Sequence, residues 1–447
     1  MSAARCPFVH DSAALSTGTT HRTSAPAGRC PFGHDKPDAA AAREAAEYDL
    51  LAPGLFLDIY PLFDRMRREA PVYFSRQLGS WVITTYEDVC DLLRDPRLSV
   101  VEELKRLDTL TAADQLALQP LKRIFTSWGN RAEPELHGQF IKLLKRYFTP
   151  SYVEAQRPRI QRILDGLLDA AVARGSMDMV NDIAHPMAMT LMAELLELPS
   201  DPDTIAEYLR CSNFISQLLE MGEREQLFNC MRGMLGLEEL LLPVVQARRQ
   251  RPGTDLVSVF FQADPTGERY SDTYVIAQII MFLVVGYHTT ANQLCNSLQI
   301  LFDRPAVRDR IAGDFSLLAN ALDEMMRFHG AVASVRRMPT EDIVVRGTAI
   351  RKHETIMLIL ASANRDPEGF VDPDTVDIDR DRANRHVGFT IGPFSCMGQA
   401  LARLEAQVFF RTVLTRFPAM RPLNATPDWI NFRPFGRELH SLPVAFT

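Results

Sequence analysis

The sequence lacks the cysteine patterns that mark a disulfide framework or a zinc site. Its seven cysteines, at positions 6, 30, 90, 211, 230, 295 and 396, include no C-x-x-C pair, and their number is odd. The N-terminus, MSAARCPFVHDSAALSTG, also has no apolar stretch of the kind that a secretory signal needs. These absences argue against a secreted, disulfide-stapled protein and predict reduced thiols in a cytoplasmic protein.

An excess of positive charge and a membrane-spanning run are missing as well. Lys and Arg number 49 against 56 Asp and Glu, so the net charge is −7, and no basic footprint for nucleic acid is present. The most apolar stretch, 275–286, is interrupted by Gln278, whereas a bilayer span needs about 20 apolar residues. We expect no nucleic-acid partner and no membrane anchor, and we interpret this stretch as part of a buried helix.

The first 45 residues are rich in Ala, Ser, Thr, Gly and Pro, so residues 1–45 are predicted to form a mobile N-terminal tail. They contain a short duplication around Cys6 and Cys30, with the sequences RCPFVH and RCPFGH. A Cys-Pro pair with a nearby His can capture a metal or a metal-bearing cofactor. The alternative is a solvent-exposed duplication without a ligand.

Residues 46–447 are predicted to form one mainly α domain with small β-sheets. Helical periodicity dominates 136–247, where an amphipathic helix at 189–198 is stopped by Pro199, and a second long helix covers 274–302. Short β-branched and aromatic runs at 71–74, 80–84, 343–345 and 355–360 predict strands.

One cysteine stands in a constrained loop. The segment FTIGPFSCMG, residues 389–398, delivers Cys396 to the start of an amphipathic helix whose buried stripe is Leu401, Leu404 and Val408. A thiolate at that point lies near unpaired backbone N–H groups and the positive end of the helix dipole, which stabilise its negative charge. The alternative for this segment in isolation is an inert, buried cysteine.

This loop resembles the haem-binding signature of the cytochrome P450 family, at Phe389, Gly392, Cys396 and Gly398, with Thr390 where the family's first Gly is usual. The resemblance covers roughly residues 50–447. It implies the cytochrome P450 fold, haem b (heme b, iron protoporphyrin IX) as the cofactor, and Cys396 as the thiolate ligand of its iron. The other three matching residues are implied to shape the cofactor site.

The E-x-x-R motif of the family is similar to Glu324-Met325-Met326-Arg327. An i,i+3 spacing places both charges on one helix face, where they can pair. The stretch ANRDP at 363–367 and the later Arg380 also match the family. The resemblance implies that Arg380 joins Glu324 and Arg327 in a structural charge cluster, so we assign these three residues to folding.

The long helix carries VGYHTT at 285–290, which is similar to the family's oxygen-activating motif. The small Gly286 lets the helix backbone approach a flat ligand, and Thr289 is implied to take part in oxygen activation. His288 stands where the family usually has an acid, and histidine titrates near neutral pH. Gly286, His288 and Thr289 are the candidate catalytic residues, with His288 as a predicted proton relay.

Two residues are implied to contact the haem propionates. His137, in the segment PELH, and Arg337, in the segment RMPTED, match family positions for this role. Two other usual donors are missing, because Ile141 and Phe394 stand in their places. Either other groups compensate, or the haem pocket is less polar than usual.

The resemblance implies a monooxygenase that inserts oxygen from O2 into a small-molecule substrate, with electrons supplied by a ferredoxin and a ferredoxin reductase. Peroxide-driven or atypical oxidation is an alternative, which His288 and Phe394 suggest. A non-catalytic haem-binding protein is the alternative from another class, and the presence of Thr289 and Thr290 argues against it.

Overall fold

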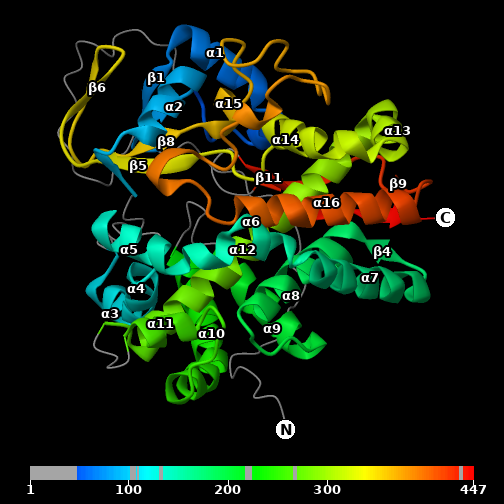
Figure 1. Ribbon diagram of the computed structural model, residues 1–447. Helices are drawn as coiled ribbons and strands as arrows, with labels where there is room; N and C mark the ends of the chain where they lie inside the picture. The colour runs from blue at the N-terminus through cyan, green and yellow to red at the C-terminus, as the bar shows by residue number, and fades with distance from the viewer. Residues whose placement is uncertain are drawn as a thin grey trace.

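The computed structural model describes residues 48–446 apart from 101–106, 108–109, 130–133, 217–223, 265–268 and 432–435. The predicted tail at 1–45 and its two Cys-Pro repeats lie outside the described residues. The remainder is mainly α-helical with small β-sheets, as predicted (Figure 1).

The helices are α1 (Tyr60–Glu69), α2 (Tyr86–Arg94), α3 (Ala112–Ala117), α4 (Gln119–Thr126), α5 (Pro134–Leu144), α6 (Pro150–Glu154), α7 (Arg157–Arg174), α8 (His185–Leu195), α9 (Pro202–Ser216), α10 (Arg224–Gln250), α11 (Ser258–Ala263), α12 (Asp272–Asp303), α13 (Pro305–Gly313), α14 (Leu318–Phe328), α15 (Leu360–Ala363) and α16 (Gln399–Arg416). The strands are β1 (Val72–Ser75), β2 (Ser80–Ile83), β3 (Leu98–Ser99), β4 (Met177–Asp178), β5 (Val335–Pro339), β6 (Ile343–Val345), β7 (Thr348–Ile350), β8 (Ile356–Leu358), β9 (Arg421–Pro422), β10 (Asp428–Asn431), β11 (Arg437–Ser441) and β12 (Pro443–Ala445).

Helix α12 runs through the centre of the molecule. Its N-cap is Ser271, whose side chain accepts a hydrogen bond from the Tyr274 N–H, and it ends before Arg304 and Pro305. By length and composition α12 could cross a membrane, but 78% of its most apolar window is buried inside the protein. A helix that is apolar on nearly all sides belongs in the core of a large protein, which is where α12 lies.

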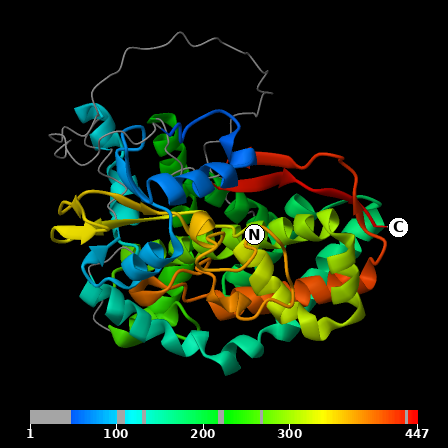
Figure 2. The same cartoon turned by 90° about the horizontal axis from the view of Figure 1, so that it is seen from above.

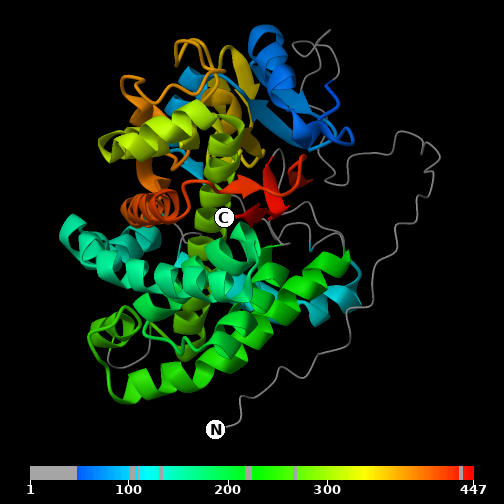
Figure 3. The ribbon, with the colours of Figure 1, turned by 90° about the vertical axis from the view of Figure 1, so that its right-hand side faces the viewer.

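The strands form a five-stranded sheet of order β1-β2-β8-β5-β3 and smaller sheets. Strand β2 pairs in parallel with β8, and β5 pairs with β8 antiparallel, with Arg337 opposite Ile356. Seen from above, the red C-terminal strands lie apart from the blue and yellow strands of the large sheet (Figure 2). From the side, they lie between the sheet-containing layer and the layer of helices α7–α10 (Figure 3), and β11 packs against α12.

The predicted charge cluster forms in the core, between Glu324 and Arg327 of α14 and Arg380 of a later loop. Glu324 and Arg327 are joined by two hydrogen bonds of 2.7 and 2.8 Å, and both side chains are fully buried. Arg380 adds bonds of 3.1 and 3.0 Å from its Nε to Glu324. Arg327 also donates to the carbonyl oxygens of Asn364 and Thr375, so the cluster fixes the chain between α15 and the Cys396 loop.

Candidate active site

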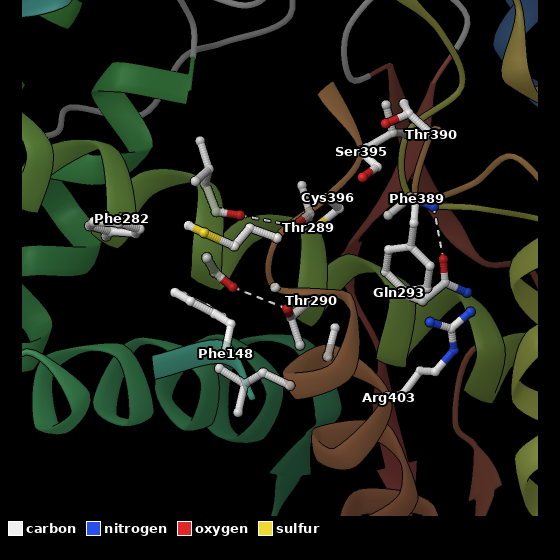
Figure 4. Close-up of a pocket in the computed structure, with 18 of the residues that line it drawn as sticks. Phe148, Phe282, Thr289, Thr290, Gln293, Phe389, Thr390, Ser395, Cys396 and Arg403 are labelled. Carbon is white, nitrogen blue, oxygen red and sulfur yellow. Dashed lines mark hydrogen bonds between the residues drawn. The ribbon is translucent and has the colours of Figure 1, made fainter. Parts of the chain in front are cut away.

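A cavity of about 490 Å³ lies between α12 and the loop that carries Cys396. Cys396 and Thr289 both line it and lie close together in the view of Figure 4, with Phe148 and Phe282 further along the wall. Most of the cavity wall is apolar. The aromatic and aliphatic side chains that line it include Phe140, Phe148, Leu195, Met281, Phe282 and Val285.

The Cys396 loop is held by backbone geometry that only particular residues allow. Gly392 has a φ of +79°, and a Cβ there would lie 2.4 Å from the Leu93 carbonyl oxygen. Glycine is therefore required at this position for both conformation and space. The Cys396 N–H donates to the Phe389 carbonyl oxygen at 2.9 Å, which closes the loop and aims the cysteine at the cavity.

The electrostatics of the Cys396 sulfur have opposing contributions. Burial raises the pKa of the Cys396 thiol, while the Gly398 N–H and the positive charge of Arg403 act in the other direction. The residue itself is exposed, and since it lines the cavity, we attribute that exposure to the cavity wall. The thiol is thus desolvated by protein on one side and open to a ligand on the other.

Thr390 takes the backbone conformation that the family's usual glycine would take. Its φ is 54°, a left-handed value that is strained for a β-branched residue. Its Oγ1 donates to the Phe394 carbonyl oxygen at 2.9 Å. This hydrogen bond, which glycine could not make, offsets part of the strain and ties the two halves of the loop together.

The α12 wall presents Gly286, Thr289 and Thr290 to the cavity. A Cβ at position 286 would lie 2.7 Å from the Sδ of Met192, so the backbone approaches closely there. Thr289 Oγ1 donates to the Val285 carbonyl oxygen at 3.0 Å, and Thr290 does the same to Gly286 at 3.0 Å (Figure 4). With its proton on the backbone, each hydroxyl directs its lone pairs elsewhere, so Thr289 can accept a hydrogen bond within the cavity.

His288 is not among the residues that line the cavity. Its Nε2 lies 3.1 Å from Oε2 of Glu438 on β11, and both side chains are largely buried. The structure therefore brings Gly286 and Thr289 together at the cavity but places His288 on the flank of α12. Its role as a proton relay stays a prediction.

Two buried polar groups lie at the rim of the cavity without a charged partner among the described residues. His137 bonds through Nδ1 to the Gly129 carbonyl oxygen at 3.0 Å, and its Nε2 has no hydrogen-bond partner. Arg337 is 5% exposed, pairs with no described carboxylate, and burial lowers its pKa to about 10. Phe394 lies between them, 5.0 Å from the His137 ring and 5.2 Å from the Arg337 guanidinium carbon.

This donor set fits the cofactor that the sequence implies. Arg337 donates to the Arg336 carbonyl oxygen at 2.8 Å but faces no described carboxylate, and His137 Nε2 has no hydrogen-bond partner among the described residues. A buried cation without a counter-charge and a buried ring nitrogen without a partner call for an anionic ligand at the same place, which the carboxylates of haem b would be. The apolar walls suit its flat ring, and Cys396 would hold its iron through the thiolate. Phe389 lines the same cavity, and the Arg403 guanidinium carbon lies 4.6 Å from its ring.

Two buried acids near the site were not identified from the sequence as candidate functional residues. Glu405 lines the cavity from α16 and is 2% exposed. Its position one residue after Leu404, on the predicted apolar stripe of that helix, is a signal that could have revealed it. Glu438 carried no such signal, because its partners on α12 lie about 146 residues away in the sequence.

Comparisons with known proteins agree with this geometry. The profile of the family described as "Cytochrome P450" matches residues 177–433. Cytochrome P450 monooxygenase PikC of Streptomyces venezuelae is 32% identical over 396 residues, which are 87% of this chain and 91% of PikC.

Solved structures are similar over nearly their whole length. Epothilone D-bound cytochrome P450epoK superimposes with a TM-score of 0.80 at 29% identity, covering 90% of this chain and 100% of that one. P450BioI, in complex with an acyl carrier protein that carries hexadec-9Z-enoic acid, gives a TM-score of 0.80 at 26% identity, covering 88% and 100%. The family profile and these relatives lead to the same assignment as the Cys396 loop, and the chain belongs to the cytochrome P450 family.

Proposed function

We propose that this cytochrome P450 is a monooxygenase that inserts one oxygen atom from O2 into an apolar organic substrate, with haem b bound through Cys396. The observation that carries the proposal is the cavity, which is lined both by Cys396 on its loop and by Thr289 on α12. When bound, haem b would supply the iron at which O2 is activated with two electrons and two protons.

The residues of the chain supply anchoring, orientation and proton handling. Cys396 would hold the iron as a thiolate, stabilised by the Gly398 N–H. His137 and Arg337 would bind the propionates. Thr289, whose hydroxyl proton is held by the Val285 carbonyl oxygen, would accept a hydrogen bond from a water molecule in the cavity and so orient it as a proton donor.

The substrate class follows from the distribution of charge around the cavity. The acidic and arginine side chains that line it all come from residues after 320, namely Asp323, Arg336, Arg337, Arg403 and Glu405. The wall built from α5, α8 and α12 is mainly aromatic and aliphatic, and its polar members are the uncharged groups of Thr289, Thr290, Gln293 and Ser297 and the ring of His137. A substrate on that side would be bound mainly through burial of apolar surface. The epothilone and the long-chain acyl group in two related structures have such surface.

The electron source and location are also proposals. For the electron source we propose a ferredoxin and its reductase, which the resemblance to the family implies. The described cysteines are all free thiols, which supports a cytoplasmic location.

Peroxide-driven oxidation is the second candidate. It is favoured by the placement of His288 outside the cavity lining, since peroxide already carries the electrons and protons that O2 needs. Turnover with a surrogate ferredoxin system, compared with turnover on hydrogen peroxide alone, separates the two candidates.

The experiment that tests the main proposal measures two quantities: binding of the substrate, and the amount of product formed per reductant consumed. A panel of apolar compounds is screened for a spin-state shift of the Soret band, and product is then compared with reductant consumed for the wild type and Thr289→Ala. We expect Thr289→Ala to bind the compound normally but to lose about 10-fold in product per reductant and to release peroxide. Thr126→Ala is the matched control, because Thr126 makes the same bond to a carbonyl four residues earlier (Lys122, 2.8 Å) on the exposed helix α4. Full coupling in Thr289→Ala would overturn the assigned role of Thr289.

A further inference from the structure

A buried polar cluster lies on the flank of α12, beside the face that lines the cavity. Glu438 Oε2 on β11 accepts from His288 Nε2 at 3.1 Å and from the Asn292 amide at 2.5 Å. His288 and Asn292 are one turn apart on α12, so one carboxylate oxygen bridges two successive turns of the helix. The His288 and Glu438 side chains are only 5% and 12% exposed.

The charge on Glu438 is fixed by these contacts. Burial alone would raise the pKa of Glu438, but hydrogen bonds from His288 and Asn292 and the charge of His288 outweigh burial and lower it. The carboxyl group is therefore ionised at neutral pH. No arginine or lysine among the described residues forms an ion pair with it, and its side-chain partners are the imidazole of His288 and the amide of Asn292.

The other titratable groups around the pair do not compete for this role. His185 of α8 has its ring 5.7 Å from that of His288, and burial, with the charge of His288, lowers its pKa to about 4. His185 is thus neutral at pH 7. Tyr287 and Cys295 on α12 have pKa values raised by burial, and the charge of Glu438 adds to both. The more distant Asp178 adds only a weak attraction for a proton at His185.

The hydrogen bond to Glu438 also selects the tautomer of His288. A carboxylate that accepts from Nε2 keeps a proton on that nitrogen, so the proton that the ring gains and loses is at Nδ1. The next residue, Thr289, lines the cavity. The sequence thus has a histidine where the family usually has an acid, and the fold supplies a carboxylate from a distant strand to the same flank of the helix.

We infer that Glu438 is a positioning residue for proton supply: it holds His288 in the tautomer and charge state from which a proton can be passed toward the Thr289 side of α12. In this step the Nδ1–H bond of the His288 ring would break and the proton would pass to a water molecule on the Thr289 side of α12. A second proton, supplied from solvent through water, would then restore the ring. Glu438 remains a carboxylate throughout, and the electrons come from the external redox partner. The inference rests on the proposed function.

The test uses the holoenzyme and the variants Glu438→Gln, Glu438→Asp, His288→Gln and the double variant Glu438→Gln/His288→Gln. The first readout is the rate of reductant consumption with a surrogate ferredoxin, measured across pH. We expect each single Gln variant to lose about 100-fold, the lower end of the range for loss of one acid–base group. The double variant should be no slower than the slower single, Glu438→Asp should recover most of the rate, and the pH step of Glu438→Gln should move to lower pH.

The second readout is unfolding, which needs no turnover. A double-mutant cycle on the wild type, the two single Gln variants and the double variant should show coupling between positions 288 and 438 at pH 7 that fades in acid, once Glu438 is protonated. Asp428→Asn is the matched control. It breaks another histidine–carboxylate pair, Asp428–His440 at 3.2 Å between β10 and β11, with exposed side chains, and should leave both readouts unchanged.

The outcomes separate the possibilities. Coupling in unfolding together with additive losses of rate would mean that the pair is only a clamp between β11 and α12, and the inference would be wrong. Absence of coupling in unfolding would show that the contact does not form and would equally overturn it. If no apolar compound gives product in the wild type, the proposed function fails. Reductant consumption would still report on proton supply and would decide the role of Glu438.

Discussion

Glu405 permits a stability prediction whose size follows from the structure. It is 2% exposed on α16, and its Oε2 has no hydrogen-bond partner among the described residues. Burial raises its pKa from 4.5 to about 8. For an acid with a raised pKa, ionisation opposes folding, so its contribution is fully present below pH 4.5 and is lost progressively as the pH rises toward 8.

The magnitude can be worked out from that difference. Each pKa unit corresponds to about 1.36 kcal/mol, and pH 7 lies about 2.5 units above the unfolded value, which gives roughly 3 kcal/mol. Glu405→Gln removes the titration. Relative to the wild type, it should gain on the order of 3 kcal/mol in the free energy of unfolding between pH 4.5 and pH 7. The test uses how this difference in unfolding free energy changes with pH. The amide introduced at position 405 is also buried, but its cost in free energy does not depend on pH.

The assay is denaturant unfolding of the holoenzyme, followed by the Soret band, at several pH values from 4.5 to 8. The infrared band of a protonated carboxyl group at neutral pH should also vanish in the variant. Glu225→Gln, at an exposed position at the start of α10, is the control and should show a pH-independent difference. A pH-independent difference for Glu405→Gln as well would refute the reasoning and show that Glu405 is ionised in the folded protein.

Three further predictions concern the cofactor loop and the charge cluster. Cys396→Ser should abolish the red-shifted Soret band of the ferrous–CO complex, and survival of that band would show that Cys396 is not the iron ligand. Gly392→Ala should lose most bound haem, measured by the ratio of Soret to protein absorbance, because its Cβ would collide with the Leu93 carbonyl oxygen. Arg327→Ala leaves the buried Glu324 charge with only Arg380 and should cost about 3–5 kcal/mol in denaturant unfolding; a cost below about 1 kcal/mol would contradict the buried geometry.

The elements that could be predicted from the sequence are those whose signal is local. The predicted helix at 274–302 is α12 at Asp272–Asp303, because apolar periodicity and a serine cap define its extent. The predicted strands at 71–74 and 80–84 are β1 and β2. The predicted strand at 355–360 is shorter, at Ile356–Leu358, because Leu360 already begins α15. A continuous apolar run does not show where a buried strand gives way to a buried helix.

The site could be predicted only where residues act through a local motif. The Cys396 loop and the α12 residues Gly286 and Thr289 were found because their spacing is short. The flank position of His288 also follows from helix geometry, since adjacent residues point about 100° apart. Its partner Glu438 did not follow, because which strand packs on that flank depends on tertiary packing.

The departure at Phe394 shows how the fold compensates for a missing polar residue. The family's donor at this position is replaced by a ring, yet the ring lies between His137 and Arg337. Burial lowers the pKa of Arg337 to about 10, so the guanidinium is still charged at pH 7. A cation near an aromatic face gains about 0.5–2 kcal/mol, and the ring also restricts the positions that both polar groups can take. We therefore propose that His137 and Arg337 remain as two donors for an anionic ligand at the rim. Phe394 contributes no hydrogen bond itself but packs against both and restricts their positions.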